Sequence, residues 1–175
     1  MIRTILGVLA LAIAGVLVAA AMQPDTFHIQ REALIKAPPE RIYAILEDFG
    51  RSPEWSPYEK KDPAMKRARS GAAKGKGAVY AFEGNGEVGQ GKLEITDATP
   101  PSRLVMRLDM VKPFEGSNVI EYRLEPERGG TNVTWAMNGA SPFLSKVICL
   151  FLNMDKMVGK DFEAGLASLK SLAEK

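Results

Sequence analysis

The stretch that decides the fold is RLVMRLDMVKPFEGSNVIEYRLEPERGGTNVTWAMN, residues 103–138. Apolar and polar residues alternate in three segments of it, 103–111, 118–125 and 131–138. This alternation is typical of strands that bury one face. Short turns separate the segments, and Gly129-Gly130 closes the second turn. We therefore expect an antiparallel meander with one apolar face.

The sequence before this stretch predicts four further strands, which makes about seven in all. Three of them cover residues 64–69, 78–83 and 87–96, and the turn Gly84-Asn85-Gly86 joins the last two. The fourth is the first along the chain, at residues 27–36, where apolar side chains again recur with a period of two.

Helices are predicted on both sides of the long run of strands. Pro38-Pro39 opens a first helix that ends at Gly50, and a second short helix follows Ser52 and reaches Tyr58. After Ser141-Pro142, apolar residues recur at helical spacing as far as Leu172, which predicts one long helix across the sheet. Within that helix Gly159 and Gly165 indicate a close approach of the backbone, or a kink.

The N-terminal segment is apolar. Ile5 to Met22 contains no charged residue and follows a single cation, Arg3. Its length is close to the ~20 residues that cross the hydrocarbon core as a helix. We expect residues 1–24 to be a membrane anchor and residues 25–175 to form one folded domain, on the non-cytoplasmic side by the positive-inside rule. The alternative is a cleaved signal peptide with Ala19-Ala20-Ala21 as its small-residue site, which would leave a secreted or periplasmic domain.

Composition excludes several classes of function. A net charge of +2 argues against a protein built for nucleic acid, and 46% hydrophobic residues are typical of a globular chain. The single cysteine allows no disulfide within the chain. One histidine and one cysteine are also too few for a metal site of the His/Cys type. We expect no cofactor.

The order of strand, two short helices, six strands and helix resembles the START-like helix-grip fold, an α+β architecture. That fold belongs to the SRPBCC superfamily of polyketide cyclases/dehydrases and lipid-transport proteins. Residues 35–43, IKAPPERIY, resemble the family's first strand running into its first helix. Asp48-Phe49 with Trp55-Ser56-Pro57, and residues 161–170, resemble its following segment and its last helix. The similarity covers about residues 25–175 and implies a fold, whereas members differ in function.

The resemblance implies a cavity between the sheet and the long helix, which would suit a small hydrophobic ligand. An alternative for each lining residue is that it simply forms the core. Ten apolar or aromatic candidates for the lining are Trp55, Phe82, Met106, Leu108, Tyr122, Trp135, Met137, Phe151, Met154 and Val158. An eleventh candidate is Asp155. It would have a raised pKa if it faced the pocket, or would be an ion-paired acid at the pocket mouth.

Two other patterns are open to a simpler interpretation. Residues 84–89 match G-x-G-x-x-G, but a strand pattern follows instead of a helix, so we interpret them as a hairpin. The basic stretch 60–76 would suit anionic headgroups, or a solvated edge strand that lysine protects from pairing.

Three hypotheses for the function follow. The first is a non-enzymatic domain that binds or transfers a hydrophobic small molecule or lipid, tethered to a membrane by residues 5–22. The second is an enzyme of the polyketide cyclase/dehydrase type, acting on a small apolar substrate with a pair such as Tyr122 and Asp155. The third is an interaction domain without a pocket. No convincing catalytic constellation is present.

Overall fold

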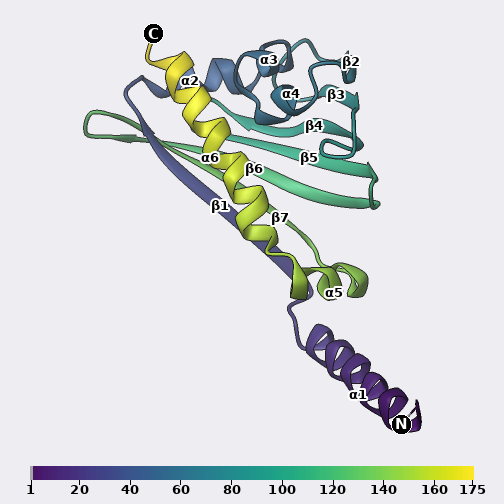
Figure 1. The fold of residues 1–175 in the computed structure, drawn as a ribbon. Coiled ribbons are helices and arrows are strands. Elements are labelled where there is room, and N and C mark those ends of the chain that lie inside the picture. The colour runs from purple at the N-terminus through teal and green to yellow at the C-terminus, as the bar shows by residue number, and fades with distance from the viewer. Residues whose placement is uncertain (1) are drawn as a thin grey trace.

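The computed structural model describes residues 2–175. Figure 1 shows a curved sheet crossed by a C-terminal helix, with a separate N-terminal helix extending from one end. The helices are α1 (Ile2–Ala21), α2 (Pro39–Leu46), η1 (Phe49–Arg51), α3 (Ser52–Trp55), α4 (Pro57–Lys61), α5 (Phe143–Phe151) and α6 (Met154–Ala173). The strands are β1 (Thr26–Ile35), β2 (Lys66–Gly71), β3 (Ala78–Glu83), β4 (Gln90–Thr99), β5 (Arg103–Lys112), β6 (Gly116–Glu127) and β7 (Gly130–Ala140).

All seven strands form one antiparallel sheet in the order β1-β7-β6-β5-β4-β3-β2. The meander predicted from residues 103–138 is confirmed as β5, β6 and β7. The first strand of the chain closes the sheet beside the last one, and Arg31 of β1 lies opposite Trp135 of β7. Trp135 in turn lies opposite Tyr122 of β6, so these three side chains share the inner face.

The core lies between this inner face and α6. Phe162, Leu166 and Leu169 of α6 are fully buried at helical spacing, and they meet strand residues such as Leu124 and Val133 that are equally buried. Because both faces are apolar where they meet, the contact excludes water and stabilises the fold. The expected α+β helix-grip architecture is confirmed.

The predicted single C-terminal helix is wrong, because the chain forms two helices. Leu152 and Asn153 leave the helical conformation, with ψ angles of 124° and 90°. The Asn153 side chain then accepts a hydrogen bond of 2.8 Å from the backbone N–H of Lys156 and caps α6. Asparagine favours such a cap over a helix interior because its side chain competes for the backbone groups.

The close approach predicted at the two helical glycines is confirmed. A Cβ added to Gly165 would lie 2.5 Å from a ring carbon of Trp135. A Cβ added to Gly159 would overlap the guanidinium of Arg31. Glycine at these two positions therefore lets α6 approach the sheet at Trp135 and Arg31.

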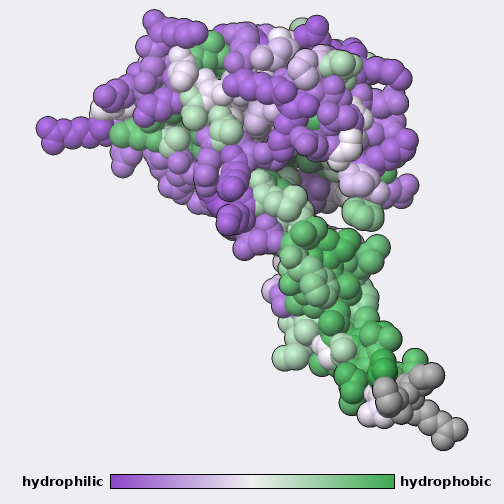
Figure 2. Space-filling view, in the orientation of Figure 1, coloured by the Kyte–Doolittle hydropathy of each residue, from purple (hydrophilic) through white to green (hydrophobic). Residues whose placement is uncertain are grey.

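Helix α1 is long and apolar enough, over Thr4–Ala21, to span a membrane or to be a signal sequence. Only residues 22–25 connect it to β1, and this connection is tied down at both ends. The backbone N–H of Met22 donates to the carbonyl of Val18, and Ser141 N–H donates to the carbonyl of Asp25. Figure 2 shows apolar residues gathered along α1 and at the adjoining end of the domain, while the rest of this face is mainly hydrophilic.

Candidate functional site

Four aromatic rings meet between the sheet and the helices. Trp55 comes from α3, Tyr122 from β6, Trp135 from β7 and Phe162 from α6. Trp135 is the centre of the group, with ring centroids 5.7 Å from Trp55, 5.1 Å from Tyr122 and 4.2 Å from Phe162. We call these four residues the aromatic cluster. All four residues are buried. The aromatic cluster is therefore largely apolar, with polar groups only at the two indole nitrogens and the Tyr122 hydroxyl.

The polar atoms of the aromatic cluster are incompletely satisfied. The indole N–H groups of Trp55 and Trp135 are buried and donate to no acceptor among the described residues. The hydroxyl of Tyr43, on α2, is also buried and has no hydrogen-bond partner in residues 2–175. An unsatisfied buried donor costs ~1–3 kcal/mol, so an acceptor brought by a ligand or a water would stabilise the site.

The phenols near the aromatic cluster stay protonated at ordinary pH. Burial raises the pKa of Tyr122 well above that of a free phenol, and the neighbouring Tyr58 raises it further. The pKa of Tyr58 is also raised, first by burial and then by the charge of Asp161. Neither phenol is therefore poised as a base near neutrality.

The structure brings most of the predicted lining residues to the same inner face. Met106 and Met137 are buried with Trp55, Tyr122 and Trp135 in one continuous core. Three further predicted residues are partly buried and pack against that core: Phe82, Leu108 and Val158. Their assignment to a cavity stays a prediction, because the same contacts are those of a packed core.

Three predicted residues lie outside this core: Phe151, Met154 and Asp155. Phe151 is 72% exposed at the end of α5, and Met154 is exposed at the start of α6. The break at Leu152 and Asn153 turns this segment away from the sheet, which is why the apolar periodicity misplaced both residues.

Asp155 is ion-paired, and this contradicts its placement as a buried carboxylate. The Arg31 guanidinium donates to both of its carboxylate oxygens, at 3.1 and 3.0 Å, and the Arg31 Nε donates to Glu163 at 2.8 Å. The hydrogen bond from Arg31 lowers the pKa of Asp155 instead of raising it. The suggested acid/base pair of Tyr122 and Asp155 is therefore not formed, and the alternative of an ion-paired acid fits.

Sequence reasoning missed a buried carboxylate on α4. Glu59 is 6% exposed and accepts hydrogen bonds from Arg67 Nε, at 2.8 Å, and from the hydroxyl of Tyr80. Burial raises the pKa of Tyr80, and the hydrogen bond to Glu59 adds to the effect. The only signal in the sequence was the charged run 59–61, which gives no partner. Because Arg67 satisfies Glu59, this group acts as a structural ion pair.

The basic stretch 60–76 lies on the far side of the domain from α1, around edge strand β2 (Figure 1). Several of its cations are paired with acids, including Lys61 with Asp161 at 2.7 Å and Lys74 with Glu47 at 3.0 Å. This arrangement fits the interpretation as a solvated edge.

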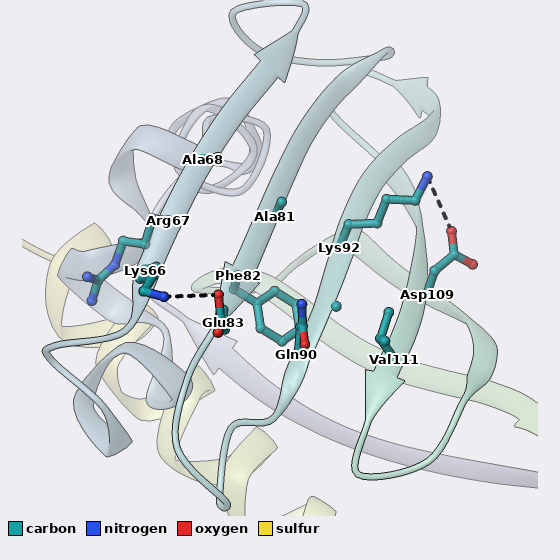
Figure 3. Close-up of a pocket in the computed structure, with 11 residues that line it drawn as sticks. Lys66, Arg67, Ala68, Ala81, Phe82, Glu83, Gln90, Lys92, Asp109 and Val111 are labelled. Atoms are coloured by element: carbon teal, nitrogen blue, oxygen red, sulfur yellow. Dashed lines mark hydrogen bonds and ion pairs between the residues drawn. The ribbon is translucent and has the colours of Figure 1, made fainter.

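A hollow lies on the outer face of the sheet, away from the aromatic cluster (Figure 3). It has a volume of about 410 Å³ and crosses β2, β3, β4 and β5. Its charged side chains pair with one another, as Lys66 does with Glu83 at 3.3 Å and Lys92 with Asp109 at 3.7 Å (Figure 3). Because four of its charged side chains are paired with one another, this groove is a weaker candidate for a ligand site than the aromatic cluster.

Comparison with known proteins identifies the family. Residues 26–174 match the model of the family described as polyketide cyclase / dehydrase and lipid transport. The chain belongs to this family. As a member of this family the chain also belongs to the START-like SRPBCC superfamily, as the sequence predicted. Among curated proteins none matches this sequence significantly.

Solved structures of similar fold are distant in sequence from this family member. Protein CV1439 from Chromobacterium violaceum has a TM-score of 0.61 at 16% identity, covering 87% of this chain and 99% of its own. The Aha1 dimer from Colwellia psychrerythraea has a TM-score of 0.58 at 22% identity, and the match covers 85% of this chain and 96% of the Aha1 chain. The di-domain ARO/CYC StfQ from the steffimycin biosynthetic pathway has a TM-score of 0.63 at 10% identity, and the match covers 85% of this chain and 51% of the StfQ chain. At these identities the likeness shows a shared fold alone.

Proposed function

We propose that this protein is a membrane-tethered domain that binds a hydrophobic small molecule or lipid between the sheet and α6, without catalysing a reaction. The observation that carries the proposal is the pair of buried indole N–H groups, of Trp55 and Trp135, that find no acceptor within the described part of the chain. A ligand with an apolar body and one carbonyl, hydroxyl or phosphate oxygen would cover the rings and accept from an indole.

Trp55 is the member of the aromatic cluster best able to move aside for such a ligand. Tyr122 and Trp135 are on central strands, and Phe162 is in the middle of the long helix α6. Trp55 instead ends a four-residue helix, α3, which is followed directly by Ser56-Pro57. Few backbone hydrogen bonds hold so short a helix, so α3 acts as a lid over the aromatic cluster.

Helix α1 supports the tethered arrangement. Thr4–Ala21 is long and apolar enough to cross a bilayer, and only 6% of it is buried inside the domain. An apolar helix left this exposed is unfavourable in water and favourable in lipid. A tether holds the domain beside lipid ligands, which raises their effective concentration at the site.

The test is native mass spectrometry of the full chain, released from membranes in detergent without added lipid. We expect a discrete extra mass that is lost on denaturation and whose identity gives the ligand class. The two tryptophans are both in the aromatic cluster, so intrinsic emission should shift when the extracted ligand is added back.

Variants connect this signal to the site. Trp55→Phe keeps a ring but removes an indole N–H, so we expect weaker retention of the extra mass. The matched control is Phe114→Leu, which alters an exposed side chain. A chain that carries no extra mass and shows no emission change with any lipid extract would refute the proposal and favour an interaction domain. Conversion of the added molecule to a product of different mass would favour the enzyme.

A further inference from the structure

Helix α5 has the reverse of the polarity expected for a helix in water. Its one charged side chain, Lys146, is only 7% exposed, and its Nζ lies 2.6 Å from Oδ1 of Asp25. Leu144 and Phe151, on the outward side, are 59% and 72% exposed. A surface helix in water turns its charges outward and its large apolar side chains inward.

The exposed apolar surface continues past α5. Phe143 precedes Leu144, and Leu152, Met154 and Met157 follow Phe151 into the first turn of α6, all of them exposed. We call these six residues the apolar end. Large contiguous apolar surfaces of this kind mark sites of contact with a protein or a membrane.

The apolar end adjoins α1. Helix α5 packs against α1, and Ala20, near the end of α1, is fully buried. The ion pair of Lys146 with Asp25 further fixes α5 to the connection between α1 and β1. Figures 1 and 2 show that α5 is at the end of the domain from which α1 leaves, where apolar colour passes from one to the other.

We propose that the apolar end is embedded in the interfacial layer of the bilayer that α1 crosses, so that the domain is docked on the lipid surface. The proposal rests on the tether proposed above. Lipid is the occupant because the apolar end is continuous with an apolar helix of membrane-spanning length. Lys156 lies between Met154 and Met157, and Lys160 is about one turn further along α6. Both are exposed and without an ion pair among the described residues, so they suit anionic headgroups.

Docking in this way sets the direction from which a ligand enters. Along β7, Gly139 is near α5, and Met137 and Trp135 follow on the inner face. Four residues of strand separate Gly139 from Trp135, or about 13 Å. A lipid that leaves the bilayer at the apolar end would therefore move along the inner face to the aromatic cluster, and it would have to displace side chains that pack there.

The natural cysteine provides the probe. Cys149 is the single cysteine of the chain and is exposed on α5. The full chain, with its intact mass checked so that α1 is retained, is labelled there with a polarity-sensitive fluorophore. It is then reconstituted in vesicles of phosphatidylcholine and phosphatidylglycerol. We expect emission shifted to the blue, and stronger quenching by a spin-labelled lipid with its label near the headgroup than by one labelled near the chain end.

Two relocated labels separate the docking from the tether. In a Cys149→Ser background, a label at Leu11→Cys in α1 should be quenched best by the deep spin label. A label at Arg128→Cys, in the distant β6–β7 turn, should not be quenched at all. Quenching at Leu11→Cys with none at Cys149 would overturn the docking and leave the tether intact. No quenching at Leu11→Cys would refute the tether itself.

A charge on the apolar end tests the surface directly. Phe151→Glu should abolish the blue shift of the Cys149 label while leaving the quenching of the Leu11→Cys label unchanged. Glu87→Gln, an exposed position on the β3–β4 turn, serves as the control that changes charge elsewhere. Oxidative cross-linking of Cys149 to Cys149, together with an unquenched label, would place a second copy on this surface and overturn the lipid assignment.

Discussion

Trp135 stacks on Phe162 with ring centroids 4.2 Å apart and ring planes 11° from parallel. This contact joins β7, which lies between β1 and β6 in the sheet, to α6, and Phe162 is almost completely buried. We expect Phe162→Ala to lower the free energy of unfolding by ~3–5 kcal/mol, because the substitution removes buried surface and leaves a cavity. Urea unfolding of the full chain in detergent, followed by tryptophan emission, measures the change. Phe114→Ala, at an exposed position, should change it by less than about 0.5 kcal/mol.

Gly165→Ala should destabilise the protein although alanine is the better helix former. The gain in helix propensity is about 1 kcal/mol. The added Cβ would lie 2.5 Å from the Trp135 ring and 3.0 Å from Cδ of Pro57, so it is confined on two sides. We expect a net loss of ~1 kcal/mol, since overpacking costs ~1–3 kcal/mol. Gly86→Ala has nothing within 4 Å and should not destabilise. An unchanged midpoint for Gly165→Ala would mean that α6 shifts freely over the sheet.

The four tyrosines should ionise only at strongly alkaline pH. Burial is the first cause of a raised pKa at Tyr43, Tyr58, Tyr80 and Tyr122, and the pKa of Tyr43 rises to about 12. Phenols in the unfolded chain titrate near pH ~10. The phenols of the folded protein keep their protons to higher pH than those of the unfolded chain. Their contribution to the free energy of unfolding is therefore fully present below pH ~10 and is lost as the pH rises through the pKa values of the folded state. Tyrosinate absorbance should appear together with unfolding, and a midpoint near pH ~10 in the folded protein would contradict the burial.

The pair of Arg31 and Asp155 should respond to acid. The hydrogen bond from Arg31 holds the pKa of Asp155 below 3.8, the ordinary value for an aspartate side chain. A lowered pKa stabilises the folded state above the unfolded value, and this contribution is lost as pH falls through the folded one. Carboxyl NMR should therefore show Asp155 titrating below 3.8 in the natural chain and at a higher pH in Arg31→Gln. The pKa of Asp109, lowered first by its hydrogen bond from Ser117, should not move in that variant.

The sheet was predictable because alternation reports the burial of each side chain directly. The segment predicted at residues 78–83 is β3 itself, and 103–111 is β5 to within one residue. Arg31 also shares the alternation of Phe27 and Ile29, so the pattern placed a cation on the inner face. It could not identify Asp155 and Glu163 as partners, since they come from the other end of the chain.

The C-terminal segment was less predictable because helical periodicity does not reveal what a stripe faces. Phe151 and Met154 are three residues apart and continue the apolar spacing across the break. Both are exposed in the structure, so the same pattern describes a buried stripe in α6 and an outward-facing one around α5. Asn153, a residue that favours helix caps, was the available signal for the boundary.

The short connection between α1 and β1 limits how far the domain can travel. Residues 22–25 would span about 14 Å if fully extended. A hydrogen bond from Met22 N–H to Val18 and one from Ser141 N–H to the carbonyl of Asp25 hold the two ends of this connection. With α1 in a bilayer, this connection is too short for the domain to reach an opposing membrane. A lipid that it holds would then come from the leaflet beneath it or from a protein that meets it there, so the protein would act at one membrane and would not carry lipid between two.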